Sequence, residues 1–260
     1  MKYSKILLSF LLSVFAISAA GQKLVEKPVD RWSKDDALNL LNNSGWAKPY
    51  QSTVGSSNAA ASQIAREQGQ TSSSGGSNPR SVARDFGPPP VTLRLFSARP
   101  IRQAMLRLKQ LDADYDKLSD DNKKKFDASQ ARFLECPICK EYYVVTLNRA
   151  VDSSGSSAEE GIFQGMTMAE LKGNIKLIND KGEVRDLVEF NAPKSVRDQA
   201  VFYFKRVDEA GQPLLSKDSK NVKLVFDSTF LDSKNRFAYL LPRTFEFSTS
   251  KMMVKDEVVF

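Results

Sequence analysis

Two cysteines, Cys136 and Cys139, are the side chains whose type and spacing point most clearly to a recognisable chemistry. A Cys-x-x-Cys pair can be a thiol–disulfide redox centre, half of a metal site or a short structural disulfide. In a redox centre the first cysteine stands at a helix N-terminus, where the helix dipole stabilises a thiolate. Here a predicted helix runs into Cys136 and strand-forming residues follow Cys139. This order favours a structural disulfide at a helix-to-strand corner, with a thiol–disulfide oxidoreductase as the alternative.

Metal and cofactor chemistry lack the residues they need. A closed zinc site takes four ligands, and the chain has two cysteines and no histidine, so carboxylates or a second chain would have to complete it. Covalent haem attachment has the same cysteine spacing, but Lys140 follows where histidine is required. We expect no metal and no cofactor.

The absence of histidine also limits the possible enzymes. It excludes Ser-His-Asp and Cys-His triads and the HExxH zinc proteases. The carboxylates between Asp112 and Asp116 have the spacing of a calcium loop, yet Lys117 stands where glycine is needed and Lys123 where a bidentate glutamate belongs. They are better explained as an acidic connector between helices. We expect a protein without a catalytic residue set.

The first 20 residues have the three-part pattern of a secretory signal peptide. Lys2 and Lys5 precede an apolar run of roughly 12 residues, which is shorter than the ~20 that a membrane-spanning helix needs. Small residues follow, and cleavage after Ala20 or after Gly21 fits equally well. The sequence therefore predicts a secreted or periplasmic chain without a transmembrane span.

The charge does not point to nucleic acid. The formal net charge is +7, but the tight basic run from Lys123 to Lys125 directly follows Asp120 and Asp121, so the local field is mixed. A solvated helix face accounts for these lysines, and we expect no nucleic-acid partner.

Residues 21–50 predict a short amphipathic helix flanked by two tryptophans. Ser33 and Asp36 form a capping pattern, and Gly45 is a stop signal. Such a helix is shorter than the ~12 to 15 residues that are stable alone in water, so it must dock on something. It can dock on the chain's own fold, or bind another envelope or secreted protein. The candidate partner-binding residues are Trp32, Leu38, Leu41 and Trp46.

The rest of the chain divides by composition into a linker and a strand-rich part. Residues 51–90 are rich in Ser, Gly, Ala, Gln and Asn, which predicts a disordered linker. Residues 91–260 contain about seven short strand-like segments separated by polar turns. They include a hairpin from Ile175 to Phe190 with a glycine-containing turn, and segments at Phe237–Leu241 and Val254–Phe260. Two amphipathic helices interrupt them at about 99–135, with one apolar stripe formed by Ile101, Met105, Leu108 and Leu111. We therefore expect an α+β fold, an antiparallel β-sandwich that is Ig-like or barrel-like and carries a two-helix insertion.

The tryptophan helix resembles the mature start of a group of uncharacterised bacterial secreted proteins. The resemblance rests on Trp32, on the central Asp36-Ala37 pair and on the segment from Leu40 to Lys48. The unit from Leu93 to Leu108 is similar to the strand-then-helix unit of that group. Gly45 departs from the proline expected there. Since the group has no known activity, the resemblance implies only the layout of helix, linker and strand–helix unit.

These observations favour a non-enzymatic interaction or structural module. The first alternative is the oxidoreductase using Cys136 and Cys139. The second is a carrier of a small apolar ligand, which would need a large cavity among Phe202, Phe204, Phe226 and Tyr239.

Overall fold

The structure is a computed structural model that describes residues 23–51, 91–149, 163–195, 198–233, 241–255 and 257–260. The predicted signal peptide lies outside these residues, as does all of the predicted linker except Gln51. The strand expected from Phe237 to Leu241 also lies outside them, apart from Leu241 itself.

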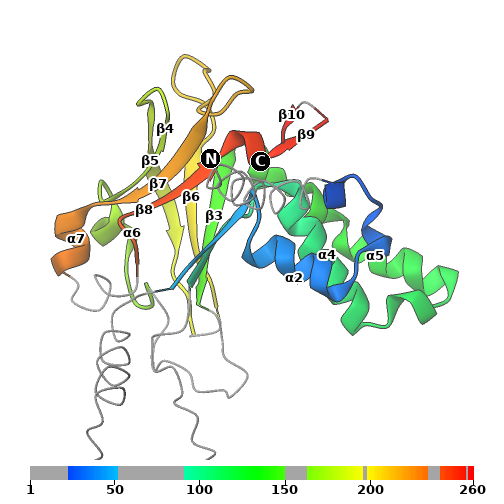
Figure 1. Cartoon of the computed structure of the whole chain (residues 1–260). Coiled ribbons are helices and arrows are strands. Elements are labelled where there is room, and N and C mark those ends of the chain that lie inside the picture. The colour runs from blue at the N-terminus through cyan, green and yellow to red at the C-terminus, as the bar shows by residue number, and fades with distance from the viewer. Residues whose placement is uncertain (1–22, 52–90, 150–162, 196–197, 234–240, 256) are drawn as a thin grey trace, which may run out of the picture.

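Eight strands form one antiparallel sheet in the order β1-β2-β3-β6-β5-β4-β7-β8 (Figure 1). An α+β fold with a barrel-like antiparallel sheet is thus confirmed, and these eight strands form one continuous sheet. The strands are β1 (Ala47–Tyr50), β2 (Val91–Leu95), β3 (Tyr142–Arg149), β4 (Ile175–Asn179), β5 (Val184–Asn191), β6 (Ala200–Lys205), β7 (Asn221–Phe226) and β8 (Thr244–Ser248).

The two edge strands of this sheet approach each other, which makes it nearly barrel-shaped. The ring of Tyr50 on β1 meets the ring of Phe245 on β8 edge to face, with centroids 6.3 Å apart. Close by, a Cβ atom on Gly45 would overlap the backbone carbonyl of Lys251 in the 3-10 helix η4 (Thr249–Lys251). Glycine at position 45 therefore permits this close approach of the chain.

Three longer helices, α2 (Lys34–Asn42), α4 (Arg99–Asp112) and α5 (Asp120–Glu135), lie together on one side of the sheet (Figure 1). The Ser33 hydroxyl and the Asp36 carboxylate form a reciprocal capping box at the start of α2, as the sequence predicts. Two helices were expected in the region that α4 and α5 occupy. The shorter helices are η1 (Val29–Arg31), η2 (Tyr115–Lys117), η3 (Pro137–Lys140), α6 (Met168–Leu171) and α7 (Ser228–Ser233).

Three elements differ from the sequence-based expectation. Strand β1 was not predicted, because Pro49 interrupts its pattern; proline is tolerated there since β1 is an edge strand. Helix α7 was not predicted either. The strand expected from Val254 to Phe260 is replaced by a small hairpin of β9 (Met253–Val254) and β10 (Glu257–Val258).

The inside of the curved sheet is filled by aromatic rings. Phe163 is fully buried, with its ring centroid 5.3 Å from that of Phe202 and 6.0 Å from that of Phe226. Phe190 stacks on Phe202 at 5.3 Å and also meets the ring of Phe163, with centroids 6.2 Å apart. Rings at these separations are in contact, so the described phenylalanines pack on one another in the space that the carrier hypothesis needs for a ligand.

Candidate functional site

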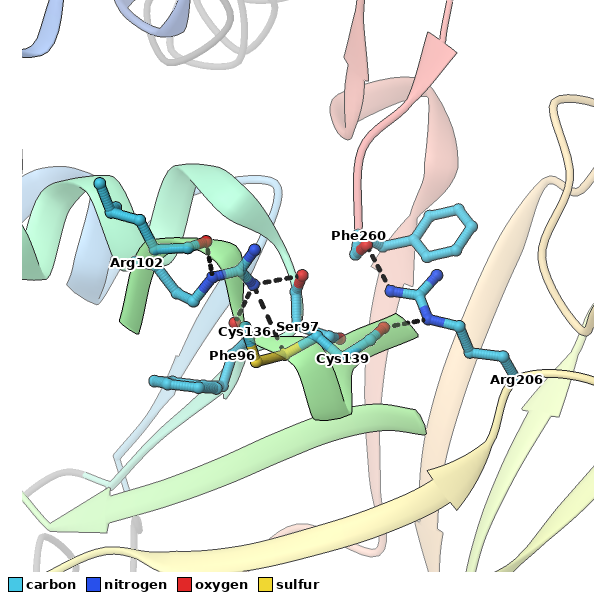
Figure 2. The surroundings of a disulfide bond; sticks show 8 residues. Phe96, Ser97, Arg102, Cys136, Cys139, Arg206 and Phe260 are labelled. Atoms are coloured by element: carbon cyan, nitrogen blue, oxygen red, sulfur yellow. Dashed lines mark hydrogen bonds between the residues drawn. A yellow bond between two sulfur atoms is a disulfide. The ribbon is translucent and has the colours of Figure 1, made fainter. Parts of the chain in front are cut away.

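Cys136 and Cys139 are joined by a disulfide bond at the corner between α5 and β3 (Figure 2). The backbone N–H of Cys136 donates to the carbonyl of Arg132 at 3.0 Å and so caps the last turn of α5. Cys136 has a φ of 46°, the left-handed conformation with which many helices end. The predicted order of elements is confirmed: a helix C-terminus precedes the pair, and β3 follows it after the short helix η3.

Arg102 of α4 lies on one side of the disulfide (Figure 2). Its Nε donates to the carbonyl of Leu134 at 3.0 Å, and Nη1 donates to those of Phe96 at 2.9 Å and Ser97 at 2.6 Å. The same Nη1 is 3.6 Å from Sγ of Cys139. One guanidinium therefore connects the first turn of α4, the last turn of α5, the end of β2 and the disulfide.

Arg206, which follows β6, lies on the other side (Figure 2). Its Nε donates to the carbonyl of Cys139 at 2.6 Å, and Nη2 donates to the carbonyl of Phe260 at 2.7 Å. Its guanidinium also faces two rings, 4.9 Å from the centroid of Tyr143 and 4.8 Å from that of Phe260. Contacts of this kind are favourable cation–π interactions. Arg206 thus ties the cysteine corner to the C-terminal segment.

The two arginines carry their charge in a poorly solvated place. Arg102 is 5% exposed, and the described residues place no carboxylate in an ion pair with it. Burial lowers the pKa of Arg102 to about 10, and the positive charges of Arg99 and Arg206 act in the same direction. Burial also lowers the pKa of Arg206. Backbone carbonyl oxygens accept hydrogen bonds from both guanidinium groups and so offset part of the cost of this burial.

The sequence pattern of α4 did not reveal these arginines. The predicted apolar stripe placed Arg102 and Arg107 on the polar side of the helix, whereas both side chains are buried and Met105 and Leu108 are only half-buried. This part of the prediction is wrong, because α4 has neighbours on several sides, namely the cysteine corner, the end of β2 and the segment before α2. A helical period identifies one buried face and cannot find a second one that binds backbone carbonyls.

The tryptophans expected to bind a partner lie in the core of the chain itself. Trp32 and Trp46 are each 1% exposed. The indole of Trp32 donates to the carbonyl of Lys27 at 3.2 Å, and that of Trp46 donates to Val259 at 2.5 Å. Of the two leucines expected to act with them, Leu41 is buried and Leu38 is half-buried. In this conformation the tryptophan helix docks on its own chain.

Two arginines hold α2 at its two ends. Arg107 of α4 donates from Nε to the carbonyl of Trp32 at 2.7 Å, just before the helix starts. Arg94 of β2 donates from Nε to the carbonyl of Leu41 at 2.5 Å, in the last turn. Burial lowers the pKa of Arg94 to about 10. A cation at a helix C-terminus is also favoured by the helix dipole. Helix α2 is therefore held by directed hydrogen bonds as well as by apolar contacts.

The acidic connector between α4 and α5 is organised by ion pairs with neighbouring cations. Asp114 is 2.9 Å from Nζ of Lys117, and Asp116 is 3.5 Å from Nη2 of Arg107. Within the described part of the chain, no cluster of three or more acidic or cysteine side chains is arranged to hold a metal ion. None of the helices described there is both long and apolar enough to cross a membrane.

Comparisons with protein-family models, with curated proteins and with solved structures give no match to this chain. The geometry of the site is that of a covalently closed corner held between the buried Arg102 and the half-buried Arg206.

Proposed function

We propose that this chain is a secreted or periplasmic protein without a reaction of its own, built to present a fixed helical surface to another protein. The observation that carries the proposal is the arrangement at Cys139. Its sulfur is bonded to Cys136 and contacts Arg102, while its carbonyl accepts from Arg206. A disulfide is compatible with an oxidising, extracytoplasmic compartment, in agreement with the predicted signal peptide.

The corner acts in this proposal as a pin for α4 and α5. The disulfide closes a ring between the end of α5 and the start of β3, and Arg102 joins the two helices through the Leu134 carbonyl. A loop this short is expected to add no more than ~2 kcal/mol by the chain-entropy argument. Replacing both cysteines by serine should therefore lower stability by that amount or less. A loss of secondary structure on this replacement would contradict a local pin.

The contact surface that remains available is the outer side of the helices. Every residue of α5 is at least partly exposed, and on α2 the exposed side chains include Lys34, Asp35 and Asn39. If α2 binds an envelope or secreted partner, it does so with these polar side chains, because Trp32 and Trp46 are already buried in the chain's own core.

A partner experiment can separate docking on self from binding a partner. Lys34, Asp35 and Asn39 are replaced together by alanine in the full chain, and proteins crosslinked to it in the native envelope are compared with those of the unchanged chain. We expect an unchanged melting temperature and loss of a defined crosslinked protein. Identical crosslinked proteins in both samples would show that α2 is not part of the contact surface. Fractionation of the same cells tests the compartment, and a cytoplasmic chain with an intact leader would refute export.

The oxidoreductase alternative has a separate test. An exchange catalyst needs an exposed nucleophilic sulfur, whereas Cys136 and Cys139 are 6% and 5% exposed and Cys136 lies at the negative end of the helix dipole. We expect the purified chain to be inert in an insulin-reduction assay. Catalysis of insulin reduction at a rate near that of a known disulfide reductase would favour the alternative.

A further inference from the structure

The position of Arg102 is not explained by the structural role of the disulfide alone. If Arg102 only bound backbone carbonyls, its contacts to Leu134, Phe96 and Ser97 would be sufficient. The guanidinium is nevertheless also placed 3.6 Å from Sγ of Cys139, in a poorly solvated place with no carboxylate paired to it among the described residues. A sulfur in a disulfide is a weak and neutral acceptor. A thiolate at the same position would be the counter-ion that this guanidinium lacks.

We propose that the Cys136–Cys139 disulfide is a reducible latch, which an external dithiol opens and from which Cys139 leaves as a thiolate paired with Arg102. The pair is then a target of thiol–disulfide exchange and not a catalyst of it. The inference goes beyond the proposed function, because a pin can hold the helices without being adapted to open.

The chemistry of opening follows from the geometry. Because Cys136 is only 6% exposed, the corner at the end of α5 must first open locally. A thiolate of the dithiol then attacks Sγ of Cys136, the bond between the two cysteine sulfurs breaks, and its electron pair passes to Sγ of Cys139. The second thiol of the reductant then attacks the mixed disulfide, which releases Cys136 and leaves the reductant as a cyclic disulfide. The protein gains two electrons, and the released Cys136 thiolate takes up a proton to become a thiol. The better leaving group is the more stable thiolate, and Arg102 makes that group Cys139.

The charges around Cys139 support this direction of opening. Nη1 of Arg102 lies 3.6 Å from Sγ of Cys139, and Nε of Arg206 binds the carbonyl of the same residue. Arg99 adds a further positive charge that acts on Arg102. The nearest ionisable neighbours in sequence, Lys140 and Glu141, are both exposed and are therefore screened by water. Cys136 has a different environment because it caps the C-terminus of α5, where a negative charge is disfavoured. The two sulfurs are thus electrostatically distinct.

The first experiment measures the ionisation of the Cys139 thiol in the full mature chain after replacement of Cys136. Two replacements are used, C136S and C136G, since glycine is the residue best suited to the left-handed backbone there. Thiolate absorbance is followed against pH. We expect a pKa at least one unit below the ordinary value of about 8.5. An ordinary or raised pKa in a folded C136G chain would overturn the proposal.

The second experiment asks whether Arg102 is responsible. R102M should return the Cys139 pKa to its ordinary value or above it, and R102K should keep part of the shift. R99M is the matched control, because it removes one positive charge from an exposed position on the same helix. If R99M and R102M have the same effect, the shift comes from the general charge of α4 and the pairing with Arg102 is refuted.

The third experiment uses the native pair, so it does not depend on the cysteine variants. The chain is equilibrated with mixtures of reduced and oxidised dithiothreitol, and the oxidised fraction is measured by thiol labelling. R102M should make the disulfide roughly tenfold harder to reduce for each pKa unit that Arg102 supplies. An unchanged equilibrium in folded R102M would overturn the proposal of a reducible latch. The localisation and crosslinking experiments would still test the proposed function independently of this result.

Discussion

Arg107 donates from Nε to the backbone carbonyl of Trp32 at 2.7 Å, which joins α4 to a residue 75 positions earlier in the chain. The indole of that tryptophan is buried at the same place. This bond places the N-terminal segment inside the architecture of the domain. It also explains why a helix too short to be stable alone persists, since its contacts come from β2 and α4 and not from its own length.

Trp46 should be one of the largest contributors to stability. Its ring is buried, and its Nε1 donates to the carbonyl of Val259, so it links the start of β1 to the C-terminal segment. We expect Trp46→Ala to lower the free energy of unfolding by about 3–5 kcal/mol, as measured by urea denaturation. Trp46→Phe keeps most of the ring and should cost clearly less. Equal stability of Trp46→Ala and the unchanged chain would mean that the segment is not docked in solution.

Arg107 should stabilise the start of α2 through the Trp32 carbonyl. Replacement by methionine removes the donor and leaves that carbonyl without its partner, which is expected to cost about 1–3 kcal/mol in the free energy of unfolding. Lys124→Met is the control, because it removes a positive charge from an exposed position on α5. A similar loss of stability in both variants would show that Arg107 stabilises the chain through its net charge and not through its bond to the Trp32 carbonyl.

Gly45 is required by the close approach of Lys251. The added methyl group of Gly45→Ala would overlap the carbonyl oxygen of Lys251, so that the segment before β1 has to move away. We expect a loss of about 1–3 kcal/mol in thermal or chemical unfolding. Because the overlap is with backbone atoms, shortening the side chain by Lys251→Ala should not restore stability. Recovery in the double variant would contradict this explanation.

Tyr115 should titrate abnormally late. Burial, the hydrogen bond that it donates to Asp127 and the charge of that carboxylate raise its pKa from 10.0 to about 12. A raised pKa in the folded chain means that the stability from the neutral phenol is fully present below pH 10 and is lost as the pH rises toward 12. Tyrosinate absorbance should include a transition near pH 12 that is missing in Tyr115→Phe. Asp127→Asn should move that transition to lower pH.

Local patterns in the sequence were sufficient for many of the elements. The capping residues Ser33 and Asp36 identified the start of α2, because the hydrogen bonds of a capping box join residues three positions apart. The strand propensity after Cys139 identified β3 in the same way, and the glycine-containing turn between Ile178 and Val184 identified the β4–β5 hairpin. These features depend on neighbours in the chain, so the sequence contains them directly.

The sequence by itself determined the spacing of the cysteines, the absence of histidine and the order of helix and strand around Cys136, and these were enough to favour a disulfide over an exchange centre. Only the tertiary structure decided that Arg102 and Arg206 flank that disulfide and that Trp32 and Trp46 are buried. The physical reason is that these contacts join residues far apart in the chain through hydrogen bonds to backbone carbonyls. Every residue offers the same carbonyl, so no pattern of side chains identifies which one a buried arginine will bind.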